Sequence, residues 1–441
     1  MVSPPSPLPA AQAPRLPPHS PPRSSPRAWQ RWTRLARAIG LALLLLWSLL
    51  LAAWLALHWA ILPHIDEWRP RIERLASRSL GLPVTLGEIR VRSGGWVPAF
   101  ELRELRVHDR DGREALYLQR VQAALAPRAL LAATLRFEQI VIDGARLQPR
   151  RDAQVGWHLA GLAWQGSLDG TDARARDWLL RQGEFVVRDA ELHWTDERAA
   201  GAPLVLRELQ FVLRNGVRSH ALRLDATPPP QWGQRFSVRG RFTQPLLAPP
   251  GAVQRWSGTL YAQFAQADVA ALRRQLDLPF ELDEGDGALR AWVDIVEGKP
   301  RRATLDVALR ALSMQLAPSL PPLRLQQVQG RLAASRDPGG IELRLHDVTS
   351  TGAAGLQRSI DDLRLRWQQA QDLHQPWTPD APITGGELAI AQLDLAALHA
   401  WIDALPLPAP LRGTLVTMAP RGHAERLALR WAGTPEQPDS Y

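Results

Sequence analysis

The chain has 441 residues, 45% of them hydrophobic, which exceeds one ordinary domain and is enough for an extensive core. The formal net charge is +9, but six of the excess positive charges are arginines within residues 1–37, so the rest lacks the clustered basic surface that nucleic-acid binding needs. There is no Cys, which excludes disulfides, zinc–thiolate sites and a Cys nucleophile.

The N-terminal region predicts a cytoplasmic leader and a membrane anchor. Residues 1–37 are basic, with a Pro- and Ser-rich stretch that predicts disorder, and no Asp or Glu occurs before Asp66. Residues 38–62 are uncharged and mostly apolar, long enough to cross a bilayer core that needs about 20 such residues. A cleaved signal peptide is the alternative, but its apolar region is only about 7–15 residues long. The positive flank predicts a cytoplasmic N-terminus, with the remainder across the membrane.

Residues 63–83 predict a short membrane-proximal helix. One face is apolar at helical spacing, and Gly81 with Pro83 ends the pattern. The residues of that face are Ile65, Trp68, Ile72 and Leu75. We expect this helix to lie against the membrane surface or to close the end of the sheet that follows.

From Val84 onward the dominant hydrophobic period is two, which predicts antiparallel sheet with one sheltered face. A one-residue slip between Leu102 and Leu105 suggests a bulge. The alternating segments are Phe236–Val238, Leu289–Ile295, Leu305–Leu309, Ile341–Leu345 and Leu427–Trp431, with a further strand at Phe185–Val187. Two-residue hairpin turns are predicted at Asp111-Gly112, Asp143-Gly144 and Asn215-Gly216.

Two internal echoes indicate a repeated unit. The sequence Leu-Arg-Glu-Leu occurs at 102–105 and again at 206–209, each time followed by a turn signal at the same offset. Asp268 and Asp394 each begin a short helical stretch as the N-cap residue. A third helix is predicted at 173–180. We therefore predict a long curled antiparallel sheet of repeated hairpins over 84–441 with a few short helices and with candidate boundaries near 170–185 and 265–280.

The order of these motifs resembles the AsmA-like superfamily, and within it the YhdP family. The resemblance spans roughly residues 35–435 and rests on soft motifs in a persuasive order. They are Leu80-Gly81-Leu82-Pro83-Val84, Leu102-Arg103-Glu104-Leu105, Ile140-Val141-Ile142-Asp143-Gly144, Gly156-Trp157-His158-Leu159, Leu192-His193-Trp194-Thr195-Asp196 and Leu276-Asp277-Leu278-Pro279.

The resemblance implies an inner-membrane protein of a Gram-negative bacterium that extends into the periplasm as a curled β-sheet with a hydrophobic groove. It implies a part in moving phospholipids toward the outer membrane and in maintaining the permeability barrier there. Members of the family are much longer, so it also implies that this chain is the N-terminal portion of such a protein.

A groove needs an apolar sheet face that stays open to acyl chains, each methylene of which contributes about 0.8 kcal/mol when buried. The alternative is a closed core, in which another sheet covers that face. The residues alone leave both open; the resemblance favours a groove. The predicted lining residues are Phe100, Leu102, Phe236, Val238, Leu305, Val307 and Leu343.

The sequence offers little for catalysis, and we predict no enzyme, no catalytic residue, no metal and no cofactor. His108 and His346 each precede an Asp at an expected strand end, and a hydrolase would need one of them. Acidic residues between Glu281 and Asp286 form a dense cluster, for which a solvated turn is favoured over a calcium site.

The predicted function is therefore binding and conduction of phospholipid acyl chains by an anchored periplasmic groove. The predicted partners are phospholipid and the inner membrane, with outer-membrane or envelope proteins as further candidates. Nucleic acid is not a predicted partner. The alternative is an envelope scaffold or assembly factor whose apolar face binds a protein partner.

Overall fold

The computed structural model separates two compact units, Met1–Ile65 and Asp66–Tyr441. It describes the following residues: 37–45, 47–49, 51–52, 55, 69–74, 77, 83–92, 99–108, 112, 114–126, 136–151, 157–159, 162–164, 171–196, 203–273, 281–337, 340–352, 355, 357–369, 383–395, 401–405, 409–433 and 438–440.

The described part of the first unit is helical. Helix covers residues 37–45, 47–49, 51–52 and 55, and its leucines and Trp47 are exposed. No helix in the described part of the chain is long and apolar enough to cross a bilayer. The predicted anchor at 38–62 also includes 46, 50, 53–54 and 56–62, which lie outside the described residues, as does nearly all of the leader. The anchor stays a prediction.

The second unit begins with helical residues 69–74 and 77, which bond to the start of the sheet. The Glu73 carboxylate accepts a hydrogen bond from the backbone N–H of Leu86 at 2.8 Å, and the Ser77 hydroxyl accepts one from Val84 at 3.0 Å. These bonds satisfy backbone donors that precede the regular ladder.

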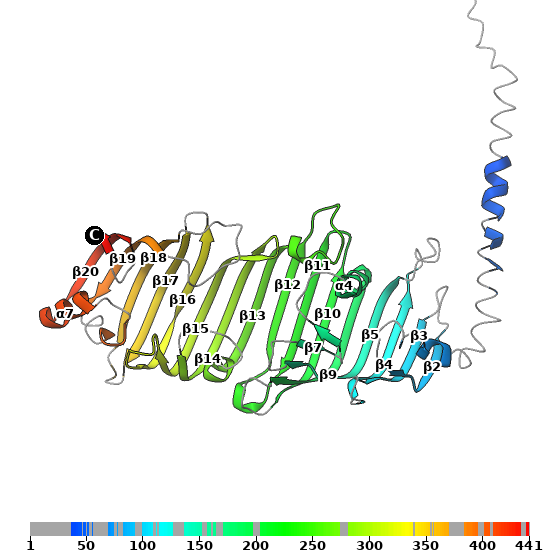
Figure 1. The fold of residues 1–441 in the computed structure, drawn as a ribbon, viewed down its shortest axis with the longest axis horizontal. Helices are drawn as coiled ribbons and strands as arrows, with labels where there is room; N and C mark the ends of the chain where they lie inside the picture. Colours follow the sequence, from blue (N-terminus) through cyan, green and yellow to red (C-terminus); the bar gives the residue numbers. More distant parts are fainter. Residues whose placement is uncertain are drawn as a thin grey trace, which may run out of the picture. The chain divides into compact units, whose positions relative to one another are not determined.

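The rest of the unit is a long, curled, open β-sheet (Figure 1), so the mostly-β prediction is confirmed. The strands are β1 (Val84–Thr85), β2 (Glu88–Arg92), β3 (Ala99–His108), β4 (Glu114–Leu125), β5 (Phe137–Leu147), β6 (Arg150–Arg151), β7 (Trp157–Leu159), β8 (Leu162–Trp164), β9 (Glu184–Asp196), β10 (Leu204–Asn215), β11 (Ser219–Thr227), β12 (Phe236–Thr243), β13 (Ser257–Asp268), β14 (Glu281–Val296), β15 (Lys299–Gln315), β16 (Leu323–Asp337), β17 (Gly340–Gly352), β18 (Gln357–Gln369), β19 (Ile383–Asp394), β20 (His423–Gly433) and β21 (Pro438–Ser440).

Consecutive strands pair antiparallel from β2 to β5 and again from β9 to β21, as the hairpin pattern predicts. The junction is different. Strand β9 pairs in parallel with β5 and also with the short β6. The chain between β5 and β9 includes helix α4 (Thr171–Arg181), which returns it to the edge at which β5 began. The sheet therefore continues through the predicted boundary near 170–185.

The helices are few. The α4 helix covers the predicted stretch at 173–180, and α5 (Val269–Arg273) begins after Asp268, whose carboxylate accepts a hydrogen bond from the Ala271 N–H at 2.9 Å. This bond confirms the predicted N-cap. In the stretch after Asp394, residues 396–400 lie outside the described residues, and Leu395 and Trp401 on either side of them are helical. Helix α7 (Ala409–Met418) was not predicted; the remaining helical turns are η3 (Pro230–Trp232) and η4 (Val253–Arg255).

The hairpin predictions had mixed outcomes. A hairpin does connect β10 to β11, but Val217 and Arg218 are its central residues: the Gly216 N–H donates to the Ser219 carbonyl at 2.7 Å, and neither Asn215 nor Gly216 has a positive φ. Asp143-Gly144 is not a turn, because both residues lie within β5, where Gly144 has φ +64°. Glycine adopts this left-handed conformation at the least cost, and a Cβ there would meet mainly the end of the exposed Gln119 side chain of β4. Asp111 lies outside the described residues.

Gly144 belongs to a recurring kink, which we define as a residue in the left-handed region between two apolar residues three positions apart. Leu102 and Leu105 flank Glu104 at φ +52°, so the predicted slip is present, and the echo at 206–209 places Glu208 at φ +50°. The kink residues are Glu104, Gly144, Asp189, Glu208, Ala311, Asp347, Asp362 and Arg426. At each kink the alternation slips by one residue and the strand bends, as at a bulge. Repetition from strand to strand accounts for the curl.

Candidate functional site

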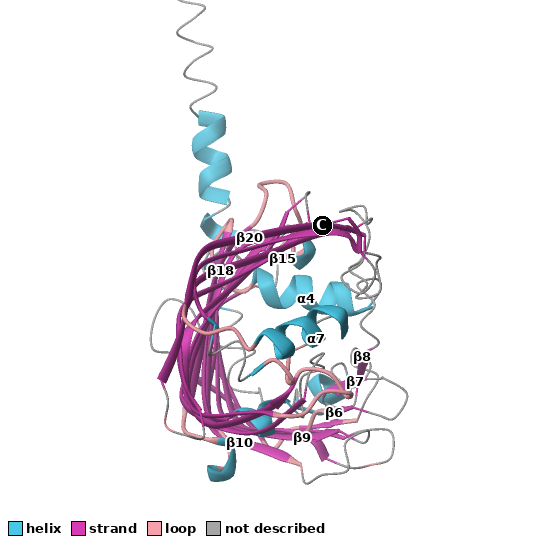
Figure 2. Ribbon diagram, turned by 90° about the vertical axis from the view of Figure 1, so that its left-hand side faces the viewer, coloured by secondary structure: helices cyan, strands magenta, loops and turns pink. Residues whose placement is uncertain are grey.

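The sheet has one apolar and one charged face. We call the inner face the side on which α4 and α5 pack, and the outer face the opposite side. Figure 2 shows α4 and α7 inside the curl. Side chains alternate between faces along a strand and stay on one face across paired residues, so the strand register assigns each position. On every long strand the positions on the inner face are predominantly aliphatic or aromatic.

The register places all seven predicted lining residues on the inner face. Phe236 lies opposite Phe264, with the rings stacked at a centroid distance of 5.1 Å, and Val238 lies opposite Ala262. The other five follow the same register: Phe100 faces Ala123, Leu102 faces Val121, Leu305 faces Ala291 and Leu332, Val307 faces Leu289 and Gly330, and Leu343 faces Ala334 and Leu365. These residues, predicted from five separate stretches, therefore share one surface.

All seven side chains are half-buried. Neighbouring side chains on the same face shield them, but none reaches the burial of the core residues around the kinks, such as Ala190 and Ala226, which have no exposed surface. An apolar surface in this state is neither a closed core nor scattered surface hydrophobics, and surfaces of this kind mark interaction sites. Their contact with lipid stays a prediction.

Among the described residues, α4 and α5 each pack on a part of the inner face. Leu180 of α4 packs on Leu213, Phe242 and Trp256, and Val269 of α5 packs on Leu309, Leu312 and Leu325. Both clusters lie near strand ends. The inner face between them, which includes Leu305 and Val238, is not part of either cluster.

A polar group closes the edge of the inner face beside α4. The His220 ring stacks on Trp256 with centroids 4.0 Å apart, and its Nδ1 lies 2.8 Å from the Asn215 side-chain oxygen. Burial lowers the pKa of His220, so the ring is neutral at pH 7. Next to it the Gln182 carbonyl accepts a hydrogen bond from the Asn215 amide at 3.0 Å, which joins β10 to the end of α4.

The outer face is lined with ion pairs between neighbouring strands. Asp306 of β15 pairs with Arg331 of β16 at 2.6 Å, and Glu342 of β17 pairs with its strand neighbour Arg344 and with Arg364 of β18, the latter at 2.7 Å. The hydrogen bond from Arg331 lowers the pKa of Asp306. Burial opposes ionisation of Glu342, but the hydrogen bonds from both arginines outweigh it, and its pKa is lowered.

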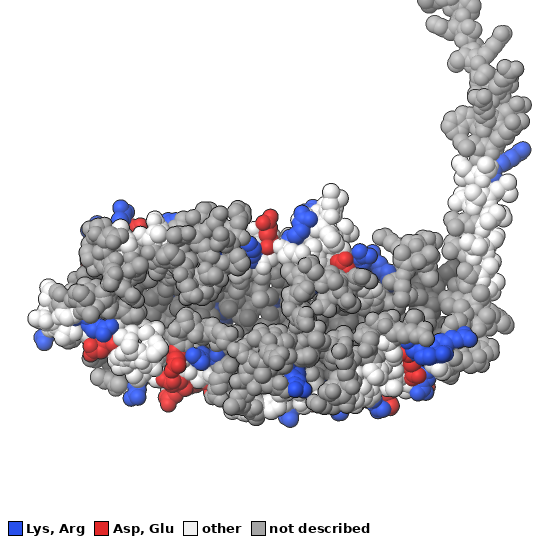
Figure 3. Space-filling model, in the orientation of Figure 1, with Lys and Arg blue, Asp and Glu red and all other residues white. Residues whose placement is uncertain are grey.

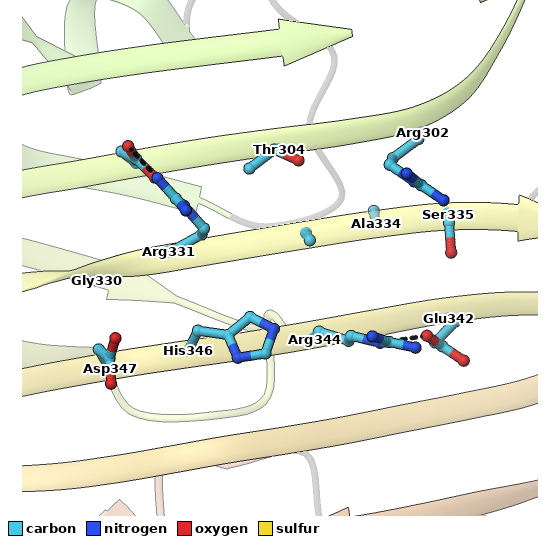
Figure 4. A pocket seen from close by; sticks show the side chains of 12 residues that line it. Arg302, Thr304, Gly330, Arg331, Ala334, Ser335, Glu342, Arg344, His346 and Asp347 are labelled. Atoms are coloured by element: carbon cyan, nitrogen blue, oxygen red, sulfur yellow. Dashed lines mark hydrogen bonds and ion pairs between the residues drawn. The ribbon is translucent and has the colours of Figure 1, made fainter. Parts of the chain in front are cut away.

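A hollow of about 820 Å³ lies on this outer face over β15, β16 and β17 (Figure 4). Arg331, Arg344 and Glu342 line it, and the ion pairs described above already engage all three. A further arginine, Arg302, lines the hollow without belonging to these ion pairs.

The candidates for catalysis are dispersed. His108 ends β3 as predicted, but His346 lies within β17, and its Nδ1 is 3.2 Å from the carboxylate of Asp362 rather than beside Asp347. The predicted acidic turn at Glu281–Asp286 is instead the beginning of β14, where Asp286 pairs with Arg310 at 3.1 Å. Among the described residues, no group of three or more His, Asp or Glu side chains is arranged to hold a metal ion.

Sequence reasoning missed part of this surface. Three inner-face residues were not predicted: Phe211, Leu213 and Leu260. The kinks were predicted only where the sequence Leu-Arg-Glu-Leu occurs twice. The missing signal is a pair of apolar residues three apart in an otherwise alternating strand, with Asp, Glu, Gly, Ala or Arg before the second one. Residues other than glycine adopt the left-handed region singly and not in runs, which agrees with one kink in each strand.

The fold and this surface together define a class: an open, curled β-sheet that presents a continuous apolar inner face and a charged outer face. The family model described as YhdP protein matches residues 30–440. The chain therefore belongs to the YhdP family.

A curated relative is the intermembrane phospholipid transporter YhdP of Escherichia coli strain K12. It is 28% identical to this chain over 162 residues, which cover 36% of this chain and 12% of the relative. The alignment thus spans about an eighth of the relative's length. No solved structure matches the chain.

Proposed function

We propose that this protein holds phospholipid acyl chains on its inner face and contributes to phospholipid transport between the two membranes of a Gram-negative envelope. The observation that carries the proposal is the continuity of a half-buried apolar face across the sheet. A two-tailed lipid gains about 0.8 kcal/mol per buried methylene, which draws it from water to such a surface. The transporter named in the comparison supports the same substrate class.

The mechanism needs no chemical step. The aliphatic side chains of successive strands offer an acyl chain many positions of nearly equal binding free energy. The acyl chain can therefore move from strand to strand across the sheet without being held tightly at one position. The head group stays at the open side of the curl, because an unpaired charge on this surface is costly. A role without catalysis agrees with the family and with the dispersed histidines.

The proposed topology follows the sequence. Residues 1–37 form a cytoplasmic leader, residues 38–62 an inner-membrane anchor, residues 63–83 a membrane-proximal helix, and residues 84–441 a periplasmic groove region that contributes to the outer-membrane permeability barrier. Fusion of a reporter active only in the periplasm after Tyr441 tests this arrangement. An inactive reporter on a full-length, membrane-bound chain contradicts it.

Site-specific photo-crosslinking tests the substrate. A photoreactive residue at Val238 or Val307 should form adducts with phospholipid in cells. The matched controls are Arg239 and Ala308, one residue along the same strands and on the outer face, where few lipid adducts are expected. Adducts with protein alone at Val238 and Val307 would overturn the proposal in favour of an envelope scaffold.

A further inference from the structure

The most exposed aliphatic residues of the second unit gather at one edge of the sheet, away from the inner face. Leu247 is 94% exposed, Val217 86% and Leu246 67%. Val217 lies in the turn between β10 and β11, and the two leucines lie in the loop between β12 and β13. We call these three residues the apolar tip. Figure 3 shows a mainly white projection at this edge, with both basic and acidic side chains near its base.

The two segments are joined by hydrogen bonds, so the tip is a single feature. The Gln244 N–H donates to the Arg218 carbonyl at 2.9 Å, and the Arg218 guanidinium donates to the Gln244 carbonyl at 3.2 Å. Beneath the tip, Gln244, Ala248 and Trp256 are buried.

The base of the tip is held from α4. Arg176 donates to the Gly251 carbonyl at 2.8 Å, and the Asp177 carboxylate accepts from the Gly251 N–H at 2.6 Å. A Cβ at residue 251 would collide with that carboxylate, so glycine is required there. Pro245, Pro249 and Pro250 further restrict the loop. A buried, bonded base thus presents two leucines and a valine to solvent.

The charges closest to the tip in its own segments are basic. Residues 215–222 and 244–258 hold Arg218 next to the tip and Arg255 at its base, with no Asp or Glu, while α4 contributes Asp177 and Arg176 beneath the loop. The adjacent turn between β14 and β15 adds one charge of each sign, Glu297 and Lys299. An aliphatic projection with a basic base suits an anionic lipid surface, where the aliphatic groups enter the interface and arginine meets phosphate.

The small apolar area of the tip favours a membrane over a protein as its partner. Three aliphatic side chains bury on the order of 300 Å². A specific protein interface takes roughly 800 Å² from each partner. The tip alone supplies less than half of that, whereas insertion into a bilayer interface needs no complementary pocket. We infer that the apolar tip inserts into the surface of a membrane that contains anionic phospholipid. This contact is separate from acyl-chain binding on the inner face.

The absence of Cys allows a direct test with single-cysteine variants of the full chain. Leu247→Cys or Val217→Cys carries an environment-sensitive fluorophore, and the protein is reconstituted into vesicles of phosphatidylethanolamine and phosphatidylglycerol with a lipid-borne quencher. The control is Arg239→Cys on the outer face. We expect quenching at positions 247 and 217 and little at 239. Label at 247 and 217 that stays unquenched, or equal quenching at 239, overturns the inference.

A second variant tests cooperation within the tip. Leu246→Asp should weaken membrane contact of a label at position 217 by about tenfold or more, because it removes an inserted aliphatic group and adds a charge of the wrong sign. The matched control is Ala308→Asp, at an exposed position on the outer face of β15, which should leave the label unaffected. Equal effects of both substitutions would contradict insertion of the tip. Lipid adducts at Val307 report the inner face separately, so either proposal can fail alone.

Discussion

The two faces of one sheet differ in what they contribute. The outer face carries ion pairs between neighbours on the same or the next strand, as Glu342 forms with Arg344 and Arg364. The inner face presents aliphatic side chains on strand after strand and leaves many of them half-buried. Adjacent residues of a strand belong to opposite faces, so two positions 3.3 Å apart along the chain test different properties of the molecule. The outer face stabilises and solubilises the sheet; the inner face is available for binding.

The largest expected effect comes from a carboxylate on the inner face at Val307, which is half-buried beside the cluster under α5. Val307→Asp should reduce phospholipid adducts at Val238 or Leu305 by about tenfold or more, because an acyl chain would have to desolvate the charge. Ala308→Asp places the same carboxylate one residue further, on the outer face, and should leave the adducts unchanged. Mass spectrometry of photo-crosslinked lipid measures both. Equal losses would mean that the two faces do not differ in lipid contact.

A second prediction concerns stability. Leu213 lies under α4 and is 6% exposed, so Leu213→Ala should lower the free energy of unfolding by about 2–5 kcal/mol. Arg331→Ala, which breaks a partly exposed ion pair on the outer face, should lower it by about 1 kcal/mol or less. Denaturant titration of the full chain in detergent measures both. A larger loss from Arg331→Ala would reverse the assignment of the two faces.

Carboxylates on the outer face should also determine how the stability of the fold changes at acid pH. The pKa values of Glu184, Asp306 and Glu342 are lowered in the folded state, so these groups stabilise it above their unfolded pKa, near 4.5 for Glu, and this contribution is lost as the pH falls through the folded values. Stability should therefore fall as the pH drops below about 4.5.

Glu342→Gln separates this contribution. It should flatten part of the acid dependence, because a neutral amide does not titrate. The control Glu387→Gln removes a more exposed carboxylate that lies 3.4 Å from Arg430, and should change the curve less. Stability measured from pH 3 to 7 checks the comparison, with about equal flattening by both variants as the contradicting result.

Much of this architecture follows from the sequence because alternation is a local property. The period of two assigns each of the seven lining residues to a face without knowledge of its neighbours, and the register then brings them together. Features that depend on distant segments were not predictable. The parallel pairing of β5 with β9 depends on how α4 returns the chain, and the apolar tip depends on a contact between Gln244 and Arg218. Asp143-Gly144 has the composition of a turn, but pairing on both sides keeps it within a strand.

The smallest expected effect concerns the left-handed residues at the kinks, where the strands bend. Ala311 has φ +50°, a conformation that costs a residue with a Cβ about 1–2 kcal/mol, whereas glycine there costs mainly chain entropy. Ala311→Gly should therefore raise the free energy of unfolding by about 0.5–1 kcal/mol. Ala308→Gly, in the same strand but with ordinary strand geometry, should lower it by about the same amount. Opposite signs, measured by denaturant titration, would establish that the left-handed residue is a built-in strain of the curl; a loss of stability in both variants would show that the backbone at residue 311 is relaxed.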